Sequence, residues 1–81
     1  MGINYNRIAH VANLSKSIDK DGIEWTNELN IISWNGGHPV YDLREWDESH
    51  NKCRVGVKLS LEEMTQLVKG FSDFVKEVEL I

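Results

Sequence analysis

Cations and an aromatic ring recur at strand spacing in the second half of the chain. Arg44 and Trp46 are two residues apart, and Lys52, Arg54 and Lys58 follow at even spacing. Side chains two residues apart on a β-strand point to the same face, so a hairpin would bring the two sets together. Single-stranded nucleic acid needs such a surface, because bases stack on flat rings and phosphates require nearby positive charge. The alternative interpretation is an ordinary solvated strand face.

Two more tryptophans, Trp25 and Trp34, lie in the apolar segment 23–34 and are further candidates for base stacking or for the core. Trp34 has the parity of Ile32, and we expect both in the core. Trp25 has the opposite parity, together with Leu29 and Ile31. That face could serve as a dimer contact or as a platform for bases, and alternation does not decide between them. The candidate nucleic-acid contacts are therefore Trp25, Asn27, Ser33, Arg44, Trp46, Lys52, Arg54 and Lys58.

Catalytic and metal-binding patterns are weak. His50 lies three residues before Cys53, but no second pair of ligands follows, whereas zinc sites need three or four ligands at short spacing. No nucleophile motif or glycine-rich phosphate loop is present in the sequence. The adjacent glutamates at 62–63 are explained by the start of a helix, whose dipole favours acidic side chains there. We expect no enzymatic activity, no cofactor and no metal.

The elements that would position these residues are four strands and a helix. Strands are expected at about 5–14, 23–34, 40–46 and 52–59, separated by the turn signals Asp21-Gly22 and Asn35-Gly36-Gly37. The helix is expected at about 60–79, opened by a capping box of Ser60 and Glu63. The predicted fold class is α+β, and we expect a single domain over residues 1–81.

The predicted helix carries more apolar surface than one small sheet can cover. Apolar residues recur every three or four positions from Leu61 to Val78, which makes a wide stripe. A chain of 81 residues buries only about 60% of its unfolded surface, so a partner is a common source of stability. We expect a homodimer, with interface residues Leu67, Phe71, Phe74, Val75 and Val78.

The charge distribution permits a nucleic-acid partner. A net charge of −4 alone argues against one, because phosphate contacts need Lys and Arg. However, residues 60–81 hold five acids and two bases, whereas residues 1–59 hold eight acids and seven bases. Binding of nucleic acid depends on the charge of the face that contacts it rather than on the total charge. One cysteine, no apolar run of membrane length and no signal-peptide pattern predict a cytoplasmic protein, nucleoid-associated if bacterial.

Three short runs carry a resemblance to a known family. They are residues 28–35 (ELNIISWN), 41–46 (YDLREW) and 56–63 (GVKLSLEE). In order and spacing they resemble the single-stranded-DNA-binding domain of the transcriptional coactivator positive cofactor four, especially its short bacterial relatives, over about 23–70. The resemblance implies a curved four-stranded antiparallel sheet, a C-terminal helix that pairs two copies, and channels for single strands. It implies neither cofactor nor catalysis.

The resemblance assigns family motif residues to particular positions of this sequence. Arg44 matches the arginine of the family's strand motif, Trp46 its aromatic residue, and Arg54 a basic residue before the glycine strand. Val55 stands where lysine is frequent, and the loop at 35–37 lacks an aromatic residue. We therefore expect a dimeric protein that binds single-stranded DNA, or RNA, with low sequence specificity and serves transcription, replication or repair. The alternative is a dimeric protein-interaction module of the same fold that has lost nucleic-acid binding.

Overall fold

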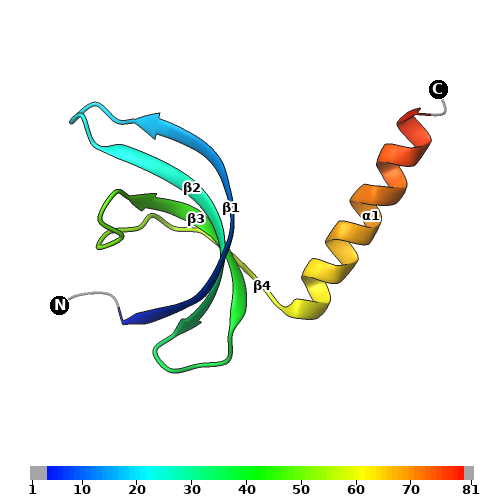
Figure 1. The fold of residues 1–81 in the computed structure, drawn as a ribbon, viewed down its shortest axis with the longest axis horizontal. Coiled ribbons are helices and arrows are strands. Elements are labelled where there is room, and N and C mark those ends of the chain that lie inside the picture. Colours follow the sequence, from blue (N-terminus) through cyan, green and yellow to red (C-terminus); the bar gives the residue numbers. More distant parts are fainter. Residues whose placement is uncertain (1–3, 80–81) are drawn as a thin grey trace.

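Four antiparallel strands form one sheet in the order β1-β2-β3-β4, and one helix follows (Figure 1). The computed structural model describes residues 4–79. The elements are β1 (Tyr5–Ile18), β2 (Glu24–Trp34), β3 (Val40–Asp47), β4 (Val57–Leu59) and α1 (Leu61–Glu79). The sheet is strongly curved, and α1 extends away on its convex side (Figure 1). The predicted fold class is confirmed.

Turns and the helix start follow local chemistry. The Asp19 carboxylate accepts hydrogen bonds from the Trp25 indole N–H (2.9 Å) and the Ile23 amide (3.0 Å), and these bonds hold its pKa below the ordinary value. The second turn uses positive φ at Asn35 (51°) and the following glycine. At α1, Ser60 and Glu63 exchange the two reciprocal hydrogen bonds of the predicted capping box.

Strand β1 is longer than predicted and is bulged. It continues to Ile18, because its polar end still pairs with the beginning of β2. Its register shifts three times, and each shift adds one residue to β1 that has no partner in β2. The side chains that share the face of Glu28 therefore recur every three residues rather than every two. They are Arg7, His10, Asn13 and Lys16.

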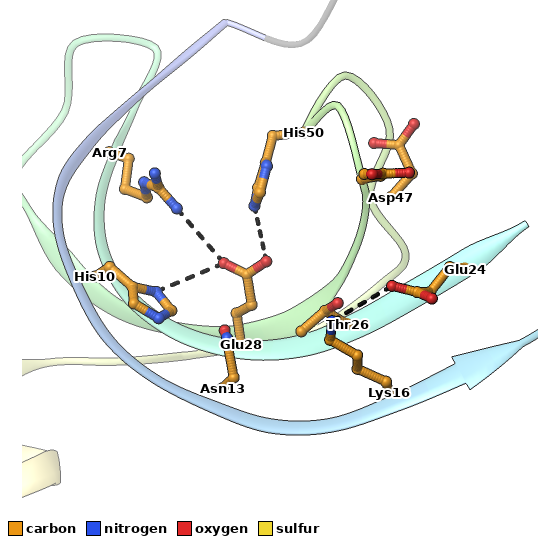
Figure 2. Close-up of a pocket in the computed structure, with 10 residues that line it drawn as sticks. Arg7, His10, Asn13, Lys16, Glu24, Thr26, Glu28, Asp47 and His50 are labelled. Carbon is orange, nitrogen blue, oxygen red and sulfur yellow. Dashed lines mark hydrogen bonds and ion pairs between the residues drawn. The ribbon is translucent and has the colours of Figure 1, made fainter.

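The register of β2 and β3 assigns their side chains to two faces. Glu28 points into the hollow of the curved sheet (Figure 2), so by register the pairs Glu28–Arg44 and Asn30–Asp42 share the concave face. The prediction that Trp34 lies in the core is wrong, because Trp34 is only half-buried, whereas Ile32 is fully buried as predicted. Both side chains lie on this concave face. The reason is that Ile32 pairs with Val40, and antiparallel partners point to the same side. The convex face carries Trp25, Asn27, Leu29, Ile31, Ser33, Tyr41 and Leu43.

The strand predicted at 52–59 is regular only over β4. Leu43 pairs with Val57, but Trp46 bridges to Cys53, so the segment between them contains one extra residue. Val55, at this irregularity, is 99% exposed. The extra residue reverses the alternation, so Arg54 and Lys58 lie on opposite faces. The prediction that they share a face is therefore wrong.

Gly56 closes this irregular segment against β3. A Cβ atom at Gly56 would lie 2.4 Å from the Cβ of Arg44 and from the Leu43 carbonyl oxygen. We expect Gly56→Ala to lower the free energy of unfolding by about 1–3 kcal/mol, because the backbone must shift to relieve the overlap. Urea denaturation measures this, with Val55→Ala as the control that should stay within about 0.5 kcal/mol of wild type. A wild-type midpoint for Gly56→Ala would contradict the prediction.

The hydrophobic core of the isolated chain is small. Among residues 4–79, the buried hydrophobic side chains are Trp25, Ile32 and Trp46. α1 approaches only β3 and β4, and most of its apolar stripe is exposed. This helix is not long and apolar enough to cross a membrane. Most of the apolar surface of α1 is thus available to a partner.

Candidate functional site

Trp46 lies beneath other aromatic rings on the concave face. It is 1% exposed, and its centroid lies 4.7 Å from that of Tyr5 and 5.7 Å from that of His50. Trp34 stacks nearly parallel to it at 6.1 Å. The prediction that Trp46 is an exposed platform is therefore wrong, because the start of β1 and the β3–β4 loop cover it. Alternation within one strand cannot reveal cover that comes from distant segments.

Arg44 is committed to a buried ion pair. Its Nε and Nη2 atoms each lie 2.7 Å from an oxygen of Asp42, whose side chain is fully buried. Burial lowers the pKa of Arg44, but the hydrogen bonds and charge of Asp42 outweigh it and raise the pKa overall. The Trp34 indole N–H also donates to Asp42 (3.1 Å), and the guanidinium lies 4.5 Å from the Trp34 ring centroid. Arg44 and Asp42 thus fix the orientation of Trp34.

Trp34, rather than Trp46, supplies the accessible aromatic ring beside a cation that the sequence analysis predicted. It is half-buried, and the exposed Lys58 places its Nζ atom 5.2 Å from the ring centroid. Trp34 therefore presents an aromatic ring with an exposed cation beside it on a concave surface. Sequence reasoning assigned Trp34 to the core. The pairing register of β2 with β3 is what assigns the Trp34 side chain to the concave face.

A buried carboxylate organises the other half of the concave face. His50 Nε2 lies 2.7 Å from Glu28 Oε2, and Asn30 donates to Glu28 Oε1 at 3.2 Å. Arg7 and His10 each lie 3.6 Å from the same Oε1 atom. Figure 2 shows Arg7 and His10, from β1, and His50, from the β3–β4 loop, converging on Glu28. A carboxylate without water is stable only with such partners.

A polar pocket of about 260 Å³ opens above Glu28. Sequence reasoning missed it, because its β1 side chains follow the three-residue spacing of the bulges. That spacing of polar residues was visible in the sequence and is the signal that could have found them. Within residues 4–79, no three or more His, Cys, Asp or Glu side chains are grouped to hold a metal ion. The pocket is lined by Arg7, His10, Asn13, Lys16, Glu24, Thr26, Glu28, Asp47, Glu48 and His50.

The other predicted contacts do not join this surface. Trp25, Asn27 and Ser33 belong to the convex face, where Trp25 is buried and the Arg54 guanidinium lies 4.2 Å from its ring centroid. Arg54 also pairs with Glu45 at 3.2 Å. The structure therefore contradicts Trp25 as an open platform for bases. Lys52 is exposed in the β3–β4 loop, and the concave face holds Arg44, Trp46 and Lys58.

The residues predicted for a dimer interface all lie on α1. Four of them are exposed in the single chain, and Val75 is half-buried. The exposed fractions range from 51% at Val78 to 67% at Phe71. The exposed four are Leu67, Phe71, Phe74 and Val78.

Comparison with known proteins matches the core of this fold. The family model of the transcriptional coactivator p15 (PC4) matches residues 22–70, which contain β2, β3, β4 and the first half of α1. An uncharacterized protein of Treponema pallidum (strain Nichols) is 37% identical over 51 residues, or 63% of this chain. The chain spans 60% of the length of that relative. Since the family model covers more than half of the chain, the protein belongs to the transcriptional coactivator p15 (PC4) family.

Proposed function

We propose that this protein binds single-stranded nucleic acid, chiefly DNA, along the concave face of its sheet. It acts as a cytoplasmic homodimer in transcription, replication or repair, without catalysis. The observation that carries the proposal is the half-buried Trp34 ring with Lys58 beside it. A base can stack on such a ring while the ammonium group contacts the adjacent phosphate. Membership of a transcriptional coactivator family supports the same function.

The concave face also fits a strand electrostatically. Its cations are Lys58, Arg44, Arg7 and Lys16. Arg44 and Arg7 face the buried carboxylates of Asp42 and Glu28, and Lys16 lies 3.5 Å from the exposed Glu24. Among residues 4–79, Lys58 is therefore the cation of this face that no carboxylate pairs with. The exposed acids of α1 are on the convex side of the sheet (Figure 1). A net negative chain therefore still offers the Lys58 ammonium group beside the Trp34 ring, and local potential rather than total charge guides the strand.

Salt dependence of binding tests this function. We expect labelled dT20 to bind more tightly than a duplex and to weaken steeply with added salt, because binding releases counterions. Lys58→Gln should weaken binding to all sequences about equally and reduce the slope of log K against log salt by up to about 1. Fluorescence anisotropy measures both quantities.

Arg54→Gln is the matched control, because Arg54 lies on the convex face beside Glu45. It should leave the salt slope unchanged. If dT20 fails to bind even at low salt, nucleic-acid binding is overturned and the alternative, a protein-interaction module of the same fold, takes its place. If Lys58→Gln leaves the slope at the wild-type value, the strand follows another path.

A further inference from the structure

The pocket above Glu28 has mixed charge, which restricts what it can hold. Four carboxylates line it together with the cations Arg7 and Lys16. A phosphate placed there would approach Glu28, Glu24 and Glu48, and an apolar ligand would displace water from the charged groups without replacing its hydrogen bonds. A neutral planar ligand with hydrogen-bond donors and acceptors along its edge satisfies both kinds of lining group. A volume of about 260 Å³ is below the usual range for drug-sized ligands, about 300–1,000 Å³, and suits one such ring system.

The floor of the pocket is fixed before any ligand arrives. The carboxylate of Glu28 can only accept, so the Asn30 amide nitrogen must face it, as the 3.2 Å contact shows. The Asn30 oxygen then accepts from Nδ1–H of His10 at 2.7 Å. His50 donates to the other Glu28 oxygen from Nε2 at 2.7 Å. Each histidine is thus held in one tautomer, and preorganised groups lose little freedom when a ligand binds.

We propose that this pocket receives one base of the bound strand and prefers guanine, an inference that rests on the proposed function. Guanine presents the acceptors O6 and N7, which suit Arg and Lys, and it carries an exocyclic amine on its opposite edge. Arg7 and Lys16 supply the donors. Glu24, which lies 3.5 Å from Lys16, and Glu48 line the same pocket and supply acceptors for the amine. Thymine lacks an exocyclic amine, so it offers the lining carboxylates fewer hydrogen-bond donors than guanine does.

The pocket and Trp34 lie on the same concave face, so one strand can occupy both. Glu28 pairs with Arg44, which in turn contacts the Trp34 ring at 4.5 Å from its centroid. A strand whose base stacks on Trp34 therefore continues toward the polar pocket. Stacking is tolerant of sequence, whereas hydrogen bonding to a base edge is selective. The two halves of the face would give general affinity and a local preference, respectively.

Base analogues test the proposal without altering the protein. Labelled dT15 is compared with the same strand carrying one central guanine, inosine or 7-deazaguanine, by anisotropy at fixed salt. We expect guanine to tighten binding about tenfold, as a good bidentate base contact does. Inosine lacks the amine and 7-deazaguanine lacks N7, so each should lose most of this gain. Equal binding of guanine and inosine would overturn the role of the carboxylates.

A protein variant, Arg7→Gln, provides a second test of the guanine preference. Arg7 is partly exposed and Glu28 keeps His50 and Asn30, so Arg7→Gln should fold. We expect it to abolish the ratio of guanine-strand to dT15 affinity, which loss of a phosphate contact would leave unchanged. Lys20→Gln, an exposed cation at the β1–β2 turn, is the control and should keep the ratio. A wild-type ratio in Arg7→Gln, or binding of dT15 without any guanine gain, would overturn the inference and leave the proposed function intact. Absence of all strand binding would overturn both.

Discussion

Arg44→Met is expected to lower the free energy of unfolding by about 3–5 kcal/mol, because it leaves a buried charge without its partner. The Asp42 carboxylate is fully buried, and both of its oxygens accept hydrogen bonds from Arg44 at 2.7 Å. Methionine preserves much of the volume, so the loss reports the charge rather than a cavity. Urea denaturation at one fixed protein concentration measures the change, since association contributes to stability.

The double variant Asp42→Asn/Arg44→Met separates charge from packing. Asparagine keeps an acceptor for the Trp34 indole N–H, which lies 3.1 Å from Asp42 Oδ2. Removing both charges should restore at least half of the stability that Arg44→Met loses, because no ion then remains in the interior. Asp42→Asn is measured as well. If the losses of stability in Asp42→Asn and Arg44→Met simply add in the double variant, the ion pair is not the source of the effect. A loss below about 1 kcal/mol in Arg44→Met would contradict the prediction directly.

Phe71→Asp is expected to convert a homodimer into monomers or unfolded chains. Phe71 is 67% exposed in the single chain and lies within the apolar stripe of α1. If a second copy covers that stripe, the new carboxylate is buried without a partner, at a cost of several kcal/mol. A loss of about 3 kcal/mol weakens dimerisation roughly 150-fold. Sedimentation velocity at micromolar concentration measures the change.

The control for this variant carries the same charge on the other side of the helix. Gln66 is exposed and outside the apolar stripe, so Gln66→Asp should remain dimeric. Circular dichroism establishes whether the Phe71→Asp chain is folded. A wild-type protein that sediments as a folded monomer at these concentrations would remove the dimer from the proposal. Dissociation by both variants would show that net charge, rather than burial, governs assembly.

Local patterns predicted the elements well because their causes are local. The capping box of Ser60 and Glu63 forms as expected, since it needs only four consecutive residues. The two turns follow from residues that tolerate positive φ. The order of strands and helix was therefore readable from the sequence.

Side-chain direction was less predictable because it depends on register. One extra residue near Val55 places Arg54 and Lys58 on opposite faces, although their spacing is even. The burial of Trp46 depends on Tyr5, which is 41 positions away in the chain. The candidate site could thus be predicted as a cationic and aromatic sheet face, but its members required the pairing of distant strands. Its aromatic ring is Trp34, and its polar half comes from β1.

The three bulges of β1 also govern how copies of this protein meet at high concentration. A regular edge strand of 14 residues would offer evenly spaced N–H and C=O groups, which another chain could extend into a growing sheet. The register shifts interrupt that spacing every three residues. An incoming strand can therefore match only a few groups before it loses register. The same irregularity that turns polar side chains into the pocket thus protects the open edge against aggregation.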